Sequence, residues 1–194
     1  AQVGVGGRGG AALAGLADEQ FVALCDVDEK RSRAGIASGK KAGPDTDRLK
    51  DAKWFKDFRV MFEKEKGIDA VLCATPDHLH AYVTIRAMRA GKHVYCEKPL
   101  THNVHEARLV REAAAKAGVV TQMGIQIHAT ENYRRVVELI QGGAIGPVTE
   151  AHVWVSRAWG LQSKEAAEKA NDRVFVTSRP AEMAVPEGQH WDLW

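Results

Sequence analysis

The chain has 194 residues, of which 45% are hydrophobic and 27% charged, and its formal net charge is +2 at pH 7. This size and composition are typical of one globular domain with part of another. Acidic and basic residues are spread along the whole length, which argues against nucleic acid as a partner. No apolar stretch is long enough to cross a bilayer, so we expect no membrane partner either.

The three cysteines lie inside or at the end of short apolar runs, where thiols usually behave as small buried hydrophobic groups. The spacing of Cys25, Cys73 and Cys96 matches neither a zinc site nor a CxxC redox motif. We therefore expect reduced thiols and no metal site. A cytoplasmic location is the expectation, with an export signal upstream of Ala1 as the open alternative, because the chain begins within a predicted strand.

From residue 21 to residue 122, short β-rich apolar runs alternate with amphipathic helical stretches. This pattern is typical of βαβ units in a parallel sheet and predicts an α/β fold of the doubly wound class. Because the apolar runs are apolar on both faces, helices should cover the sheet on both sides. We expect strands at residues 2–5, 21–25, 53–55, 70–74, 93–96 and 119–122.

The helices between these strands carry recognisable end signals. Asp57 can cap the helix that follows it, and Asn103 with Glu106 three residues later resembles a capping box. Gly91 and Gly118 stand where left-handed C-caps are expected.

Beyond residue 122 the pattern changes. Apolar residues recur with helical spacing from residue 133 to residue 140, and residues 148–155 alternate polar and apolar as in a strand. Residues 160–194 are polar and irregular, and a structureless tail of that length is unusual inside a complete domain. The sequence therefore predicts a second domain that begins but is cut off.

A glycine-rich loop follows the first predicted strand. Gly4, Gly6 and Gly9 fit the pattern G-x-G-x-x-G before a helix-compatible stretch, and Gly7 and Arg8 complete the loop. Such a loop lets a dinucleotide diphosphate approach the backbone and the free N–H groups of a helix N-terminus. We expect these five residues to contact the cofactor. The alternative is a glycine-rich turn without a ligand.

An acidic residue ends the second predicted strand at the spacing that a dinucleotide site requires. Asp26 lies about twenty residues past the glycine loop, where a carboxylate can accept hydrogen bonds from both ribose hydroxyls and repel a 2′-phosphate. NAD is therefore favoured, while Arg8, Lys30 and Arg31 keep NADP open. The alternative is that Asp26 caps the helix after it.

Two further motifs follow the fourth and fifth predicted strands, at the edge where open α/β sheets bind ligands. Residues 74–80 read A-T-P-D-H-L-H and residues 96–100 read C-E-K-P-L. Together with the glycine loop, these motifs resemble those of the Gfo/Idh/MocA oxidoreductases, which carry A-T-P-x-x-x-H and E-K-P in this order. The resemblance covers roughly residues 1–160 and implies a Rossmann domain followed by an α+β substrate domain with a large mixed or antiparallel sheet.

The resemblance assigns the central catalytic role to Lys98, beside the nicotinamide and the substrate hydroxyl. A partly desolvated ammonium near a positive ring can relay a proton, which agrees with this role. Glu97 would position the cofactor, and Pro99 would fix the turn, in this family often with a cis bond.

The A-T-P segment is expected to contact the cofactor as well. Thr75 and Pro76 would shape the loop under the nicotinamide ribose, and His80 would begin the next helix close to the cofactor. The alternative for His80 is a solvated or capping histidine. His78 has no matching role in the family and is expected to face solvent.

The segment that leaves the first domain, residues 122–128, resembles M-G-N-Q-G-H of sugar-active members, with Ile125 and Ile127 departing from the pattern. Gln126 is expected to contact both cofactor and substrate. The other residues that would reach a sugar or polyol, besides Lys98, are His128, Tyr133, Arg157 and Trp159.

The resemblance therefore implies an NAD(P)-binding Rossmann domain at residues 1–123 and an incomplete C-terminal domain at residues 124–194. The implied activity is hydride transfer between a sugar or polyol hydroxyl carbon and the nicotinamide. A homo-oligomer, dimer or tetramer, is expected. An NAD-dependent glycosidase of the same family and a non-catalytic nucleotide-binding protein are the alternatives.

Overall fold

The computed structural model describes residues 1–16, 18–37, 49–154, 163–169, 178–179 and 181–194. The chain divides into two units, of which unit 1 comprises residues 1–126 and 185–194 and unit 2 comprises residues 127–184. Nothing in the sequence indicated that residues 185–194 return to the first unit. The assignment of residues 124–194 to a substrate domain stays a prediction.

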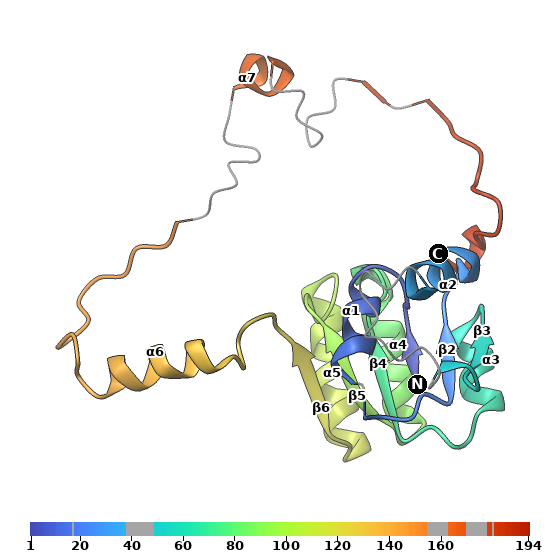
Figure 1. The fold of residues 1–194 in the computed structure, drawn as a ribbon, viewed down its shortest axis with the longest axis horizontal. Helices are drawn as coiled ribbons and strands as arrows, with labels where there is room; N and C mark the ends of the chain where they lie inside the picture. Colours follow the sequence, from blue (N-terminus) through green and yellow to red (C-terminus); the bar gives the residue numbers. More distant parts are fainter. Residues whose placement is uncertain (17, 38–48, 155–162, 170–177, 180) are drawn as a thin grey trace. The chain divides into compact units, whose positions relative to one another are not determined.

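Unit 1 is built on a six-stranded sheet in the order β3-β2-β1-β4-β5-β6, with every neighbouring pair parallel (Figure 1). This is the order of the doubly wound fold, so the predicted class is confirmed. Each predicted strand is present, with ends shifted by two residues at most. The strands are β1 (Gln2–Val3), β2 (Ala23–Cys25), β3 (Lys53–Phe55), β4 (Ala70–Cys73), β5 (His93–Glu97) and β6 (Thr121–Gly124).

Helices pack on both faces of this sheet because successive side chains along a strand point to opposite faces. Within β2, Leu24 belongs to a core with Leu13 of α1, whereas Cys25 belongs to a core that includes Met61 of α3 and Val110 of α5. The helices of unit 1 are α1 (Arg8–Gly15), α2 (Glu29–Ala37), α3 (Phe58–Lys64), α4 (Asp77–Arg89) and α5 (Val104–Ala117).

The predicted helix ends are confirmed. Asp57 accepts a hydrogen bond from the backbone N–H two residues later at 2.8 Å, and Asn103 accepts one from the N–H of Glu106 at 3.0 Å. Gly91 and Gly118 have φ angles of 72° and 63°, in the left-handed region that glycine adopts without strain.

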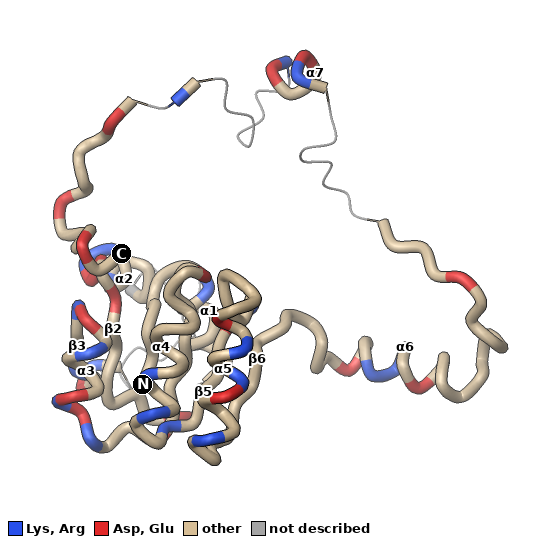
Figure 2. The backbone as a smooth tube through the Cα atoms, turned by 180° about the vertical axis from the view of Figure 1, so that it is seen from behind, with Lys and Arg blue, Asp and Glu red and all other residues tan. Residues whose placement is uncertain are grey.

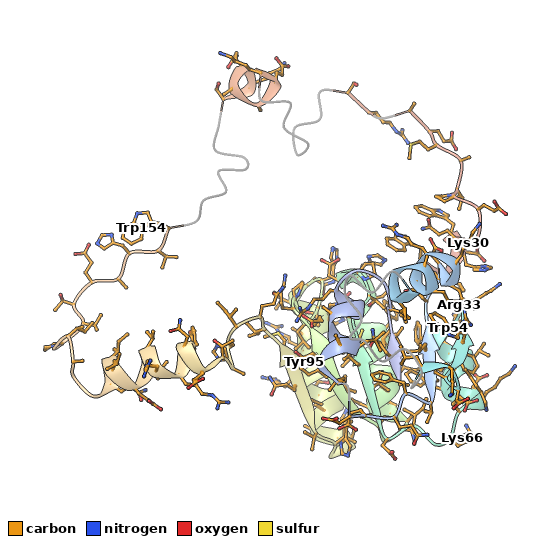
Figure 3. The ribbon with its side chains drawn as sticks, viewed as in Figure 1. Lys30, Arg33, Trp54, Lys66, Tyr95 and Trp154 are labelled. Atoms are coloured by element: carbon orange, nitrogen blue, oxygen red, sulfur yellow. The ribbon has the colours of Figure 1, made fainter. Side chains whose placement is uncertain are left out.

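An arginine on α2 connects that helix to the edge strand β3. The guanidinium of Arg33 lies over the Trp54 ring, 4.3 Å from its centroid (Figure 3). A cation–π contact of this kind contributes about 0.5–1 kcal/mol at an exposed site. It helps to hold α2 against β3.

The charged residues of unit 1 do not separate by sign. Figure 2 shows acidic and basic residues interleaved along the chain, as the nearly balanced composition suggests. Among the described residues, no helix is long and apolar enough to cross a membrane.

Unit 2 contains α6 (Glu131–Gln141) and α7 (Lys164–Lys169). The helix predicted from residue 133 to residue 140 is confirmed by α6. The strand predicted at residues 148–155 is wrong over its described part, because residues 148–154 form no strand. A strand requires a neighbour for its backbone N–H and C=O groups, and no described segment of unit 2 pairs with it. Val153 and Trp154 are instead 87% and 84% exposed.

Candidate functional site

Two glycines of the segment that runs from the end of β1 into the first turn of α1 are required by backbone packing. A Cβ on Gly4 would lie 2.6 Å from the backbone of Ala74, and the φ of Gly4 is 82°. A Cβ on Gly9 would collide with the carbonyl oxygen of Gly4 and lie 2.6 Å from the Gln2 side chain. These contacts let the first turn of α1 lie directly against the strand that precedes it.

The other two glycines of the loop leave space open instead. A Cβ on Gly6 would meet only the Ser32 hydroxyl, at 3.7 Å, and a Cβ on Gly7 would meet nothing within 4 Å. Both residues line a cavity. The missing side chains therefore keep the backbone of this loop accessible to a group in that cavity, as a diphosphate requires.

Asp26, at the end of β2, is hydrogen-bonded to the glycine loop. Its Oδ2 accepts from the N–H groups of Val5 at 2.8 Å and Gly6 at 3.2 Å, and its Oδ1 accepts from Asp28 N at 3.0 Å. A carboxylate offers about four acceptor positions, so about one is left for a ribose hydroxyl. The alternative, that Asp26 caps the helix after it, is wrong, because the N–H of Arg31 in the first turn of α2 donates to Asp28 at 2.9 Å.

A cavity of about 610 Å³ lies next to the glycine loop, at the carboxyl ends of the strands from β3 to β4. Its size is within the range of roughly 300–1,000 Å³ that small-ligand sites occupy. In a doubly wound sheet, the acid at the end of the second strand marks the adenosine half of the site. The charged and loop residues that line it are Gly4, Gly6, Gly7, Asp26, Asp28, Arg31, Lys56, Asp57, Arg59, Thr75, Pro76 and Asp192.

A salt bridge connects the glycine loop to the E-K-P loop after β5. Arg8 Nε lies 2.9 Å from Glu97 Oε1, and Glu97 is only 4% exposed. A buried carboxylate is costly unless it is paired, and Arg8 supplies the opposite charge. The second oxygen, Glu97 Oε2, is buried and has no hydrogen-bond partner within the described part of the chain. It is therefore available to a donor such as an amide or a hydroxyl.

A second buried side chain joins the A-T-P loop to the E-K-P loop. His80 on α4 is 2% exposed, and its Nδ1 lies 2.5 Å from the carbonyl oxygen of Pro99 while its Nε2 lies 2.8 Å from that of Thr75. Carbonyl oxygens only accept hydrogen bonds, so both ring nitrogens donate and His80 is an imidazolium. The solvated-histidine alternative is wrong, because the ring of His80 is buried between the A-T-P and E-K-P loops.

The charge of His80 agrees with its surroundings. Burial alone would lower the pKa of His80, but contacts with the Cys96 sulfur and hydrogen bonds to the two carbonyls raise it to about 9. The bond between the two loops is therefore present at neutral pH.

The side chains of Cys73, His80 and Cys96 form a buried cluster whose ligand atoms lie within 4.8 Å of one another. Sequence spacing did not reveal this cluster, because it arises from the register that places Cys73 beside Cys96 in adjacent strands. Both nitrogens of His80 face carbonyl oxygens, which leaves no lone pair for a metal ion. All three cysteines are free and buried, as the sequence predicted.

Lys98 lies between two residues that are fixed from opposite sides. Its own N–H donates to the carbonyl oxygen of Gly124 at 3.0 Å, and its peptide bond to Pro99 is cis. Glu97 before it pairs with Arg8, and the Pro99 carbonyl after it accepts from His80. The backbone of Lys98 is thus held at the carboxyl edge of the sheet while its side chain is exposed.

The described residues predicted to contact substrate belong to two different units of the chain. Gln126 is an exposed residue of unit 1, whereas His128 and Tyr133 belong to unit 2, where their rings lie 5.1 Å apart. Arg157 and Trp159 lie outside the described residues. Their roles stay predictions.

His78 was expected to face solvent, and its side chain is 39% exposed, but it also makes a contact that the sequence did not indicate. Its Nε2 donates to the carbonyl oxygen of Trp194 at 2.6 Å, and its ring packs edge-on against the Trp194 ring. The sequence held no signal for this contact, since the two residues lie 116 positions apart.

A parallel sheet in this strand order, with an open glycine loop, an acid at the end of β2 and a cavity where the order reverses, defines a dinucleotide-binding Rossmann fold. The family GFO_IDH_MocA, described as an oxidoreductase family with an NAD-binding Rossmann fold, matches residues 2–125. The chain belongs to this family. The predicted family and the predicted NAD cofactor are confirmed.

Known relatives extend well beyond the length of this chain. It is 36% identical over 109 residues to a 1,5-anhydro-D-fructose reductase of Ensifer adhaerens, covering 53% of this chain and 33% of the relative. It is 32% identical over 139 residues to inositol 2-dehydrogenase 1 of Saccharopolyspora erythraea, covering 71% of this chain and 38% of the relative. The chain thus spans about a third of the length of these relatives.

Solved structures show the same fold. The WlbA dehydrogenase from Bordetella pertussis, in complex with NADH and UDP-GlcNAcA, has a TM-score of 0.61 and 25% sequence identity. The match covers 73% of this chain and 42% of that one.

The packing of the glycine loop predicts opposite effects for two substitutions in one helix. Gly9→Ala should lower the free energy of unfolding by about 3 kcal/mol, because the added methyl group collides with the Gly4 carbonyl. Gly15→Ala is the control: its Cβ meets nothing within 4 Å, so stability should be unchanged or rise by up to about 1 kcal/mol. Urea denaturation measures both, and equal stability of the two variants would contradict this account.

The pKa of His80 predicts a loss of stability at alkaline pH. The pKa is raised from 6.5 in the unfolded chain to about 9, so the contribution is fully present below pH 6.5 and is lost as the pH rises through about 9. Its size is on the order of 3 kcal/mol. The difference in unfolding free energy between the wild type and His80→Gln, measured by urea denaturation from pH 6 to pH 10, should shrink accordingly. If the unfolding free energies of the two proteins differ by a constant amount over this pH range, a buried imidazolium is ruled out.

Proposed function

We propose that this chain is the cofactor-binding part of an NAD-dependent oxidoreductase that acts on a hydroxyl-bearing carbon of a sugar or polyol. The observation that carries the proposal is the linkage of three loops at one edge of the sheet. Arg8 connects the glycine loop to Glu97, and His80 connects Thr75 to Pro99. Lys98 lies inside this linked set, and Thr75, which His80 ties to the same set, lines the cavity that suits adenosine.

The residues present fit a dinucleotide. Gly6 and Gly7 expose backbone for the diphosphate, Asp26 retains an acceptor position for a ribose hydroxyl, and Thr75 and Pro76 line the same cavity. The unpartnered buried oxygen Glu97 Oε2 is a further acceptor that a cofactor amide or hydroxyl could satisfy. When bound, NAD supplies the acceptor or donor of a hydride.

The role proposed for Lys98 is to orient the substrate hydroxyl and to exchange a proton with it. An ammonium on a fixed backbone can donate to the hydroxyl oxygen or, once deprotonated, accept its proton. The rigid support on both sides limits the movement of the side chain to its own flexible stem.

The names of the relatives, an anhydrofructose reductase and an inositol dehydrogenase, support a polyhydroxylated substrate. Gln126, His128, Tyr133, Arg157 and Trp159 are the residues proposed to recognise it. Assembly as a dimer or tetramer and a cytoplasmic location are part of the same proposal.

Binding of NAD is tested by filling the open space beside Gly6. Gly6→Val should leave the fold intact, since a Cβ there has only Ser32 nearby, but its side chain should remove most NAD affinity. Isothermal titration calorimetry on this chain should detect NAD binding to the wild type and to Gly15→Ala, with at least about tenfold weaker binding to Gly6→Val. No heat from the wild type would end the proposal.

Catalysis by Lys98 is tested in the gene product that contains this chain. Lys98→Ala should retain NAD affinity while kcat falls about 100-fold or more on a panel of polyols, because general acid–base catalysis contributes factors of this size. Lys98→Met provides the control that keeps the length of the side chain without its charge and should lose as much. Unchanged turnover in either variant would remove Lys98 from the mechanism.

A further inference from the structure

The segment Val185–Trp194 packs within unit 1, although a whole unit separates it from Gln126 along the chain. Gly188 turns the backbone with a φ of 88°, and the N–H of His190 then donates to the carbonyl oxygen of Val27 at 3.0 Å. A 3₁₀ turn, Trp191–Leu193, follows. Figure 1 shows this end of the chain beside α2.

The last described residue is held by the first turn of α4. Trp194 is 44% exposed, its carbonyl oxygen accepts from His78 Nε2 at 2.6 Å, and the two rings lie 6.0 Å apart at 61°. The segment is therefore anchored twice, by Val27 after β2 and by His78 after β4. The two anchors follow β2 and β4, the strands on either side of β1.

Four residues of the segment line that cavity together with the glycine loop. They are Gln189, Asp192, Leu193 and Trp194, and they share it with Gly6, Gly7 and Asp26. His78 does not belong to the lining. The same lining includes Leu79 and Tyr82, so Trp194 and Leu193 share the cavity with further apolar and aromatic residues.

We propose that residues 189–194 form one wall of the adenosine half of the cofactor site, where Trp194 contacts the adenine base. The inference rests on the proposed NAD binding and adds residues that the glycine loop and Asp26 do not supply. An adenine base presents a π-face, and an aromatic side chain beside it is a favourable contact. The carboxyl ends of β2 and β3 are the position that adenosine takes in this fold.

The test uses two probes, each of which represents a part of the cofactor. ADP carries adenosine and diphosphate, whereas inorganic diphosphate engages the glycine loop alone. Trp194→Ala should weaken ADP binding by roughly tenfold and leave the binding of diphosphate unchanged. Trp154→Ala is the matched control, since Trp154 belongs to unit 2 and is 84% exposed (Figure 3). Dissociation constants are measured by NMR titration of the 194-residue chain.

A second variant distinguishes loss of the contact between Trp194 and adenine from loss of the fold. His78→Ala removes the anchor of Trp194 without touching the cavity wall, so it should weaken ADP binding in the same direction. The double variant should be no weaker than Trp194→Ala alone, because both changes act through one contact. If Trp194→Ala does not fold, as judged by far-UV circular dichroism, His78→Ala carries the test.

Each outcome decides the matter. Unchanged ADP affinity in both variants would overturn the inference while leaving NAD binding intact. Tighter ADP binding would show that the segment obstructs the cavity, which also overturns it. A wild-type chain that binds neither ADP nor NAD would instead refute the proposed function together with this inference.

Discussion

The two carbonyl oxygens that accept hydrogen bonds from His80 belong to different loops, one after β4 and the other after β5. A single buried imidazolium therefore fixes the spacing between Thr75 and Pro99, and the Arg8–Glu97 salt bridge fixes the same loop against the first turn of α1. Neither the buried imidazolium of His80 nor the buried carboxylate of Glu97 would be stable in the interior alone. Each is held by groups from another loop, so the strand ends form one rigid edge.

That edge contains several features that favour binding over stability. Glu97 keeps a buried oxygen without a partner in the described structure, and Gly6 and Gly7 leave open backbone where side chains could pack. Unsatisfied buried oxygens usually cost about 1–3 kcal/mol. Such costs are expected at a site that gains its missing contacts from a ligand. Lys98 lies at the centre of this region with its backbone supported and its side chain exposed.

Most of the fold of unit 1 could be predicted from the sequence, because strand runs, cap residues and the glycine loop depend on local chemistry. Gly4 and Gly9 are required by contacts within a single βα turn, which is why their spacing is informative. The bridge that His80 makes between two loops could not be predicted from the sequence, since it depends on two carbonyls brought together by the sheet register. The packing of Trp194 depends on a contact across most of the chain. The strand predicted at residues 148–155 is wrong over its described part because alternation alone does not supply a partner strand.

The claim that one dinucleotide spans the linked loops is tested most directly by mapping NAD contacts on ¹⁵N-labelled protein by NMR. The account predicts that saturating NAD shifts the amide signals of Gly6 and Gly7 together with those of Thr75 and Lys98, while signals of α6 in unit 2 stay in place. Shifts confined to one loop, or located away from the carboxyl ends of β1, β4 and β5, would contradict it.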